Sequence, residues 1–298
     1  MIKGIFAGRS VLFQFGVLFV LALTGFFVAS TASFVLVVVL NAAGMDTDSV
    51  AYMQCTQLLV SVFVFLFPAI AAAWLCSEQP AAFLNLRRIP DVRLSGWIVM
   101  ATFLISPTIS LAGYFNMQMQ LPEFMAPLER LMREMEDAAM EVVAKMMRER
   151  GFLSLLVNLT VIAVAAGICE EFLFRGAILS ILRRKIRNPH VAIWIVAVIF
   201  STIHFQFYGF VPRMLLGAFL GYLLYWTKSI WPPVLAHFLN NAAAVTGMSS
   251  DALKDNAFFA EELPADDLGW FSVVAAVTLI AFFGCMRMIW RITGRSAG

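Results

Sequence analysis

Residues 169–176 read Cys-Glu-Glu-Phe-Leu-Phe-Arg-Gly and lie inside an apolar segment, 152–182, that is long enough to cross a lipid bilayer. Glu170, Glu171 and Arg175 would place three charges at membrane depth, where each costs about 2.5–3.5 kcal/mol on insertion scales. Charged residues at that depth usually face an interior cavity and take part in chemistry or transport. We therefore expect this segment to contribute to a polar site among membrane helices.

The composition of the whole chain agrees with this expectation. Of its 298 residues, 61% are hydrophobic and 13% are charged, and the mean hydropathy is +0.85. Soluble proteins have about 45–50% apolar and about 25% charged residues. The sequence thus predicts an all-α, polytopic bundle of transmembrane helices surrounded by a lipid bilayer. No segment resembles a nucleic-acid-binding module, so no nucleic-acid partner is expected.

Eight segments could form transmembrane helices, each of which needs about 20 apolar residues. They are 11–41, 52–76, 96–115, 152–182, 190–207, 211–228, 231–249 and 268–290. The sixth and seventh predict a tight helical hairpin, because Pro232 and Pro233 suit the first turn of a helix. Near the N-terminus, the apolar run resumes from Phe34 after a stretch that resembles a cleavage site, so we expect an uncleaved first helix rather than a signal peptide.

Basic residues gather in alternate connections, as the positive-inside rule describes. With Lys3 and Arg9 in the cytoplasm, the cytoplasmic connections and tail carry Arg87, Arg88, Arg93, Arg183, Arg184, Lys185, Arg187, Lys228, Arg291 and Arg295. The opposite side receives acidic residues, and Arg213 and Lys254 are its exceptions. The pattern predicts a multi-pass protein of a bacterial-type plasma membrane with both termini in the cytoplasm.

The long connection on the outer side, 117–150, has an amphipathic pattern. Its apolar residues recur at helical spacing and are Leu128, Leu131, Met132, Met135, Ala139, Val142, Val143 and Met146. Charged residues occupy the other side of the same helix. The pattern predicts an amphipathic helix that lies in the membrane interface or caps the bundle, with an ordinary packed surface helix as the alternative.

The expected depth of the polar residues in the membrane, and the helix face on which each lies, indicate which of them can meet. With a rise of about 1.5 Å per residue, Glu170, His204 and His237 overlap between the inner half and the middle of a core about 30 Å thick. Glu171 and Arg175 are four residues apart and predict an ion pair, whereas Glu170 points about 100° away from it. Two other pairs also share a helix face: Phe200 with His204, and His237 with Asn241.

Three motifs, Glu170-Glu171-x-x-x-Arg175, Phe200-x-x-x-His204 and His237-x-x-x-Asn241, stand in this order in three separate predicted helices. In order and spacing they resemble the motifs of the CAAX protease and bacteriocin-processing family, also called Abi proteins, which includes the CAAX prenyl endopeptidase. The resemblance covers about residues 150–245. The first 115 residues share only hydropathy with that family.

The resemblance implies an intramembrane endopeptidase that cleaves a peptide bond with a glutamate-activated water and needs no cofactor. Glu170 would be the general base, and His204 would hold and polarise the water. His237 and Asn241 would stabilise the oxyanion, while Glu171, Arg175 and Phe200 would support these residues. The expected partner is a membrane-associated peptide or protein, with or without a lipid anchor.

The resemblance also implies a single integral membrane domain, 1–298, in which 151–249 is the catalytic core. The other parts are N-terminal membrane helices in 1–115, an amphipathic outer loop in 116–150, and an outer loop and last helix in 250–298.

General chemistry is compatible with these roles. Peptide hydrolysis requires a base that works near neutral pH and hydrogen-bond donors aimed at the oxyanion. An asparagine amide and the N–H of a neutral histidine are such donors. Inside a membrane the reaction also requires a water-filled cavity. The depths of the residues predict that this cavity opens to the cytoplasm.

Other functions compete with this hypothesis. Glu170, His204 and His237 would also suit a catalytic zinc site, although no His-Glu-x-x-His motif is present. Intramembrane charges also occur in transporters, and a non-enzymatic immunity protein is a further alternative. Cysteine catalysis is another, because Cys169 adjoins Glu170. We predict instead that all four cysteines, Cys55, Cys76, Cys169 and Cys285, are free, buried and inert thiols.

Overall fold

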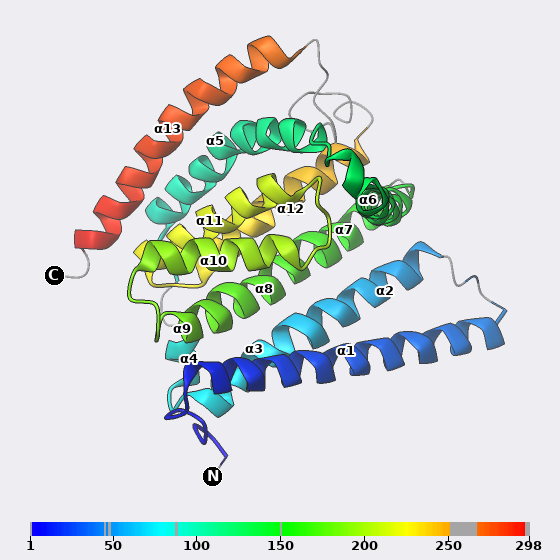
Figure 1. Cartoon of the computed structure of the whole chain (residues 1–298), viewed down its shortest axis with the longest axis horizontal. Coiled ribbons are helices and arrows are strands. Elements are labelled where there is room, and N and C mark those ends of the chain that lie inside the picture. The colour runs from blue at the N-terminus through cyan, green and yellow to red at the C-terminus, as the bar shows by residue number, and fades with distance from the viewer. Residues whose placement is uncertain are drawn as a thin grey trace.

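The computed structural model describes residues 2–44, 46, 49–86, 89–149, 151–250 and 267–295. Helices form the fold throughout these ranges, which confirms the predicted all-α class (Figure 1). On one side of the bundle, α1 (Val11–Ala42) packs against α2 (Val50–Val60) and α3 (Phe67–Cys76). On the other side, α13 (Leu268–Arg295) packs against α5 (Val92–Met117).

Five helices among the described residues are long and apolar enough to cross a membrane, so the protein is a multi-pass membrane protein. They are Val11–Ala42, Val50–Cys76, Val92–Met117, Phe152–Leu182 and Leu268–Gly294.

The other three predicted crossings are also helices, but they are not both long enough and apolar enough to count as membrane-spanning helices. They lie in the middle of the bundle (Figure 1): α10 (Pro189–Thr202) has 14 residues, α11 (Phe210–Thr227) has 18, and α12 (Trp231–Ser249) has 19. The predicted count of eight crossings is therefore not confirmed. The predicted hairpin of α11 and α12 is present, with both prolines in the first turn of α12.

The helix that carries the glutamates is not a regular α-helix. It consists of α7 (Phe152–Asn158), the π-helical segment η3 (Leu159–Ala165), α8 (Ala166–Glu171), the π-helical segment η4 (Phe172–Ile178) and α9 (Leu179–Leu182). The two π-helical segments therefore flank α8 and the glutamates at its end. Such segments are rare and are frequent at functional sites.

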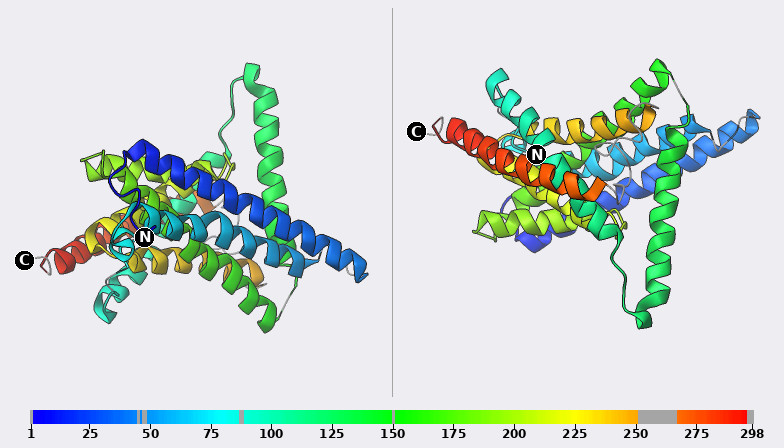
Figure 2. Two further views of the ribbon diagram at one scale, coloured as in Figure 1. Left: turned by 90° about the horizontal axis from the view of Figure 1, so that it is seen from below. Right: turned by 90° about the horizontal axis from the view of Figure 1, so that it is seen from above.

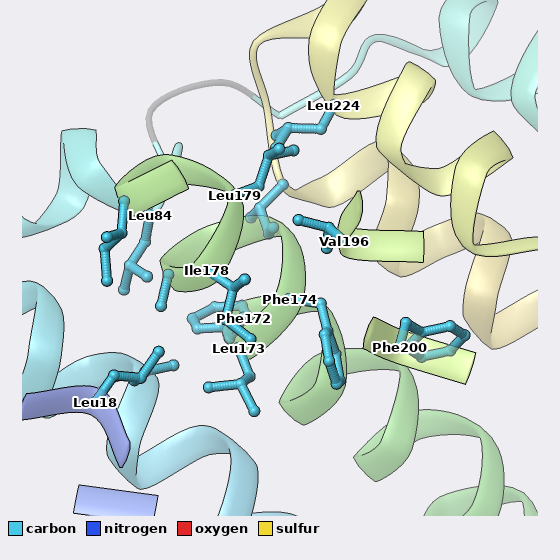
Figure 3. Packing of buried hydrophobic residues seen from close by; sticks show 14 of the residues in the cluster. Leu18, Leu84, Phe172, Leu173, Phe174, Ile178, Leu179, Val196, Phe200 and Leu224 are labelled. Carbon is cyan, nitrogen blue, oxygen red and sulfur yellow. The ribbon is translucent and has the colours of Figure 1, made fainter. Parts of the chain in front are cut away.

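The largest apolar cluster surrounds this helix (Figure 3). The ring of Phe174 lies edge-on to that of Phe200, with 5.1 Å between their centroids, and this contact joins η4 to α10. Cys76, Cys169 and Cys285 are buried and free as predicted. Cys55 is free but exposed, so its predicted burial was wrong.

Glycines on α11 allow it to lie close to α10. A Cβ atom at Gly217 would lie 3.2 Å from the Cα atom of Ala197, and one at Gly221 would lie 2.7 Å from a methyl group of Ile193. Small residues four positions apart permit such close contact between membrane helices. The interface between α10 and α11 therefore depends on the absence of side chains at these two positions.

We expect the substitution Gly217→Val to lower the free energy of unfolding by about 1–3 kcal/mol, because a larger side chain would force α10 away from α11. Gly284→Val is the control, since a Cβ atom at Gly284 would meet no atom within 4 Å. Thermal unfolding of both variants in the same detergent measures the difference. Equal stability of the two variants would contradict the tight interface.

The predicted amphipathic helix is α6 (Ala126–Met146), which lies across one end of the bundle (Figure 2). Its apolar residues Leu128, Leu131, Met135 and Val142 are exposed. On its inward side Glu136 and Met146 are buried, whereas Arg130, Glu134, Asp137 and Glu141 are exposed. Because several apolar side chains stay exposed beside charged ones, α6 suits a position in the membrane interface.

Candidate active site

A cavity of about 280 Å³ brings together residues from all three motifs. The motif residues that line it are Glu170, Phe200, His204, His237 and Asn241. Its other walls are Ile109, Gly209, Pro212, Arg213, Leu216 and Asn240. Among the predicted site residues, Glu171 and Arg175 do not line the cavity. Cys169 does not line it either, so nothing in the geometry favours cysteine catalysis.

Glu171 and Arg175 form the predicted ion pair behind the cavity. Both side chains are fully buried, and Oε1 of Glu171 lies 2.6 Å from Nη1 of Arg175. Nη2 of Arg175 also donates to the carbonyl oxygen of Gly217, at 2.9 Å. The pair therefore joins α8 to η4, and the guanidinium ties η4 to α11.

The same carboxylate orients His237. Nδ1 of His237 lies 2.9 Å from Oε1 of Glu171. An ionised carboxylate can only accept, so Nδ1 carries the hydrogen and donates. The other ring nitrogen, Nε2, then faces Glu170, whose Oε2 atom is 3.9 Å away.

The ring of His204 is held in a similar way. Its Nδ1 atom lies 2.8 Å from the carbonyl oxygen of Phe200, which can only accept, so this nitrogen also carries a hydrogen. In both neutral imidazoles Nε2 is consequently an acceptor. A neutral His237 in this tautomer uses its only N–H for Glu171, and it would donate to an oxyanion only as an imidazolium.

Phe200 lies at the centre of the site and is 1% exposed. Its ring is edge-on to His204 and His237, with centroid separations of 5.1 and 5.9 Å. The guanidinium carbon of Arg175 lies 4.6 Å from the centre of the same ring, within the range of a cation–π interaction. Phe200 thus supports both imidazoles and the ion pair.

The carboxamide of Asn241 is held by two neighbours. Its Nδ2 atom donates to the carbonyl oxygen of Ile162 at 3.0 Å, which ties α12 to η3. Its Oδ1 atom accepts from Nδ2 of Asn240 at 3.2 Å. One N–H of Asn241 remains for a ligand, so a role as an oxyanion donor stays a prediction.

His204 lies in a turn rather than in a helix. The predicted helix 190–207 is too long, because α10 ends at Thr202. Phe205 has a φ of 53°, a left-handed conformation that stops a helix from continuing. The turn between α10 and α11 brings His204 to the cavity from the end of the bundle at which α6 lies.

Two elements outside the motifs hold this turn. On α6, Oε2 of Glu136 accepts from the backbone N–H of Tyr208 at 3.0 Å, and Oε1 of Glu129 accepts from its hydroxyl at 3.2 Å. Hydrogen bonds from Arg133 and from the Leu121 N–H lower the pKa of the Glu129 carboxyl, so it stays an ionised acceptor.

On α5, Asn116 contacts the end of the turn and the first residues of α11. Its Nδ2 atom donates to Phe207 O at 3.1 Å, and its Oδ1 atom accepts from the N–H of Val211 at 2.7 Å. A single carboxamide therefore bridges the end of the turn and the start of α11.

The cavity does not have, among its described residues, the set of ligands that a metal ion requires. Within the described parts of the chain, no three His, Cys, Asp or Glu side chains converge closely enough to hold one. The residues that line the cavity therefore do not form a metal site in this arrangement.

Residues 152–243 match the family model described as Rce1-like, type II CAAX prenyl endopeptidase. This segment, called the Rce1-like segment below, is similar to that family. The match confirms the resemblance predicted from the three motifs and nearly coincides with the predicted range. The searches of curated proteins and of solved structures each found no match.

The Rce1-like segment contains every predicted site residue and most of the cavity wall. Ile109 of α5 and the contacts of α6 with Tyr208 come from outside it. The family is one of CAAX-type endopeptidases, which act on peptide or protein substrates. The N-terminal helices and α6 lie outside the Rce1-like segment, and α6 contacts the turn that carries His204.

Two polar residues of the cavity wall, Asn240 and Arg213, were not predicted as site residues. Asn240 adjoins Asn241, and successive side chains on a helix point about 100° apart. Arg213 had appeared only as an exception to the charge pattern. That exception was the one signal in the sequence that could have pointed to it.

Proposed function

We propose that the protein is an intramembrane endopeptidase in which Glu170 activates a water molecule. The single observation that carries this proposal is the shared cavity, in which one carboxylate and two oriented imidazoles from two helices and a turn meet. The family match supports the same class of reaction. We further propose a membrane-associated peptide or protein as the substrate, with or without a lipid anchor.

In the proposed reaction, a water oxygen attacks the carbonyl carbon of the scissile bond while a water proton passes to Glu170. Nε2 of His204 accepts a hydrogen bond from the water and fixes its orientation. The remaining N–H of Asn241, and His237 when it is an imidazolium, donate to the oxyanion. Glu170 then returns its proton to the leaving amine as the C–N bond breaks.

The cavity walls favour entry from one end of the bundle. Gly209, which lines the cavity, adjoins Tyr208, and α6 contacts Tyr208. In the predicted topology this end is the outer one. We therefore propose access from the α6 end in place of the cytoplasmic access expected from helix depths.

The experiment uses purified protein in detergent and a panel of quenched fluorescent peptides, both lipidated and unlipidated. We expect cleavage by the wild type, and a loss of about 10²-fold in kcat/KM for His204→Ala, because the water loses an orienting acceptor. His190→Ala is the matched control, since this third histidine lies outside the cavity and contacts Tyr222.

Each cleavage assay is repeated after metal ions have been removed with a strong chelator. Activity that survives in protein shown by elemental analysis to be metal-free supports the glutamate mechanism. Activity that disappears on chelation and returns with zinc would support the metal-dependent alternative. Equal losses in the two histidine variants, or the absence of any cleavage, would contradict the proposal.

A further inference from the structure

Arg213 lies in the first turn of α11 and lines the cavity beside the predicted catalytic residues. Its Nη2 atom donates to Oε1 of Gln206 at 2.7 Å. Its Nη1 atom is buried and has no hydrogen-bond partner among the described residues. A buried donor without a partner costs free energy, and more so when it is charged, so its presence calls for an explanation.

The surroundings leave room for this guanidinium. A Cβ atom at Gly209 would lie 3.0 Å from Nη2 and 3.3 Å from Nη1, so a larger residue there would press on the group. Glu136 and Glu170 attract the positive charge from two sides, but neither carboxylate forms an ion pair with it. Glu136 already accepts from the N–H of Tyr208, and Glu170 faces His237.

We propose that Arg213 binds a carboxylate of the peptide substrate and thereby selects which bond is cleaved. This rests on the proposed function. A guanidinium donates several N–H groups in one plane and suits a carboxylate better than any other side chain does. The cavity of about 280 Å³ is small for a ligand pocket, so the bound carboxylate lies within a few residues of the scissile bond.

The carboxylate has two sources, the free C-terminus of the substrate or an acidic side chain near the cleaved bond. Three peptides of one sequence separate them. The first has a free C-terminus, the second has a C-terminal amide, and the third has a C-terminal amide with a glutamate near that end. The cleavage rates of all three are measured with the wild type, Arg213→Gln, Arg213→Lys and Arg130→Gln.

We expect the wild type to prefer a carboxylate-bearing peptide over the plain amide by about 10- to 100-fold in kcat/KM, the range for hydrogen bonds between charged groups. Arg213→Gln should reduce this preference to about twofold, and Arg213→Lys should retain part of it. Arg130 is exposed on α6 and does not line the cavity, so Arg130→Gln should keep the full preference.

The ratio of kcat/KM between the carboxylate-bearing peptides and the plain amide peptide distinguishes binding of the substrate by Arg213 from an effect of Arg213 on catalysis alone. If Arg213 acted only on the charge of Glu170, its loss would slow the cleavage of all three peptides equally. A wild type that cleaves acid and amide peptides equally, or a preference that survives Arg213→Gln, would overturn the proposal and leave the proposed function intact. Thermal unfolding in detergent verifies that each variant is folded.

A binding measurement covers the case in which no peptide is cleaved. Fluorescence anisotropy with labelled acid and amide peptides is recorded for the wild type and for Arg213→Gln. Tighter binding of the acid peptide that depends on Arg213 would support the carboxylate site even if the proposed function failed. Equal or absent binding of both peptides, without cleavage, would overturn both proposals.

Discussion

Replacing Glu170 with glutamine is expected to reduce kcat for peptide cleavage by about 10²- to 10⁴-fold, the usual contribution of a general base. A carboxamide has the same shape as the carboxylate but cannot take a proton from water. Glu170 lines the cavity and takes no part in the Glu171–Arg175 ion pair. The substitution should therefore leave the packing of the bundle unchanged.

The measurement compares kcat with the thermal unfolding temperature for Glu170→Gln and for the control Glu134→Gln. Glu134 is exposed on α6, so its loss should change neither quantity. A Glu170→Gln variant that retains activity within about threefold of the wild type would show that another group is the base. A wild type without any activity towards peptides would favour the transport or immunity alternatives instead.

Replacing Arg175 with methionine is expected to lower the free energy of unfolding by about 3–5 kcal/mol, because one partner of a buried ion pair is removed. Glu171 would then hold a negative charge at a position with no exposure to solvent. Its Oε2 atom has no hydrogen-bond partner among the described residues even with Arg175 in place. The carbonyl oxygen of Gly217 would also lose its side-chain donor.

Two further variants test this explanation. The double variant Glu171→Gln with Arg175→Met removes both charges, and it should be more stable than Arg175→Met alone. Lys145→Met breaks the exposed pair of Lys145 with Glu141, which has the same spacing in sequence and a separation of 3.0 Å. The loss there should be below about 1 kcal/mol. Similar losses for Arg175→Met and Lys145→Met would contradict the importance of burial.

The spacing of residues within one helix predicted much of the site. Glu171 and Arg175 were expected to form an ion pair, and they do. The hairpin of α11 and α12 was also predicted closely. Such features depend on helical periodicity, which any single helix expresses whatever surrounds it.

Other features depend on how the helices meet. The contact of His237 with Glu171, which decides which ring nitrogen faces the cavity, joins positions 66 residues apart. The turn that carries His204 is held by Tyr208, which binds to α6, and by Asn116 of α5. No local pattern indicates either arrangement.

The sequence by itself determined that this is a membrane protein and which residue types meet at its site, because hydropathy and spacing are local properties. Only the tertiary structure decided that Glu136 of α6 is buried, that π-helical turns flank the glutamates, and that Arg213 joins the cavity. The physical reason is that the rotation of one helix relative to another follows from side-chain packing between distant segments. A buried guanidinium nitrogen without a partner among the described residues, such as Nη1 of Arg213, can be recognised only once all its neighbours are in place.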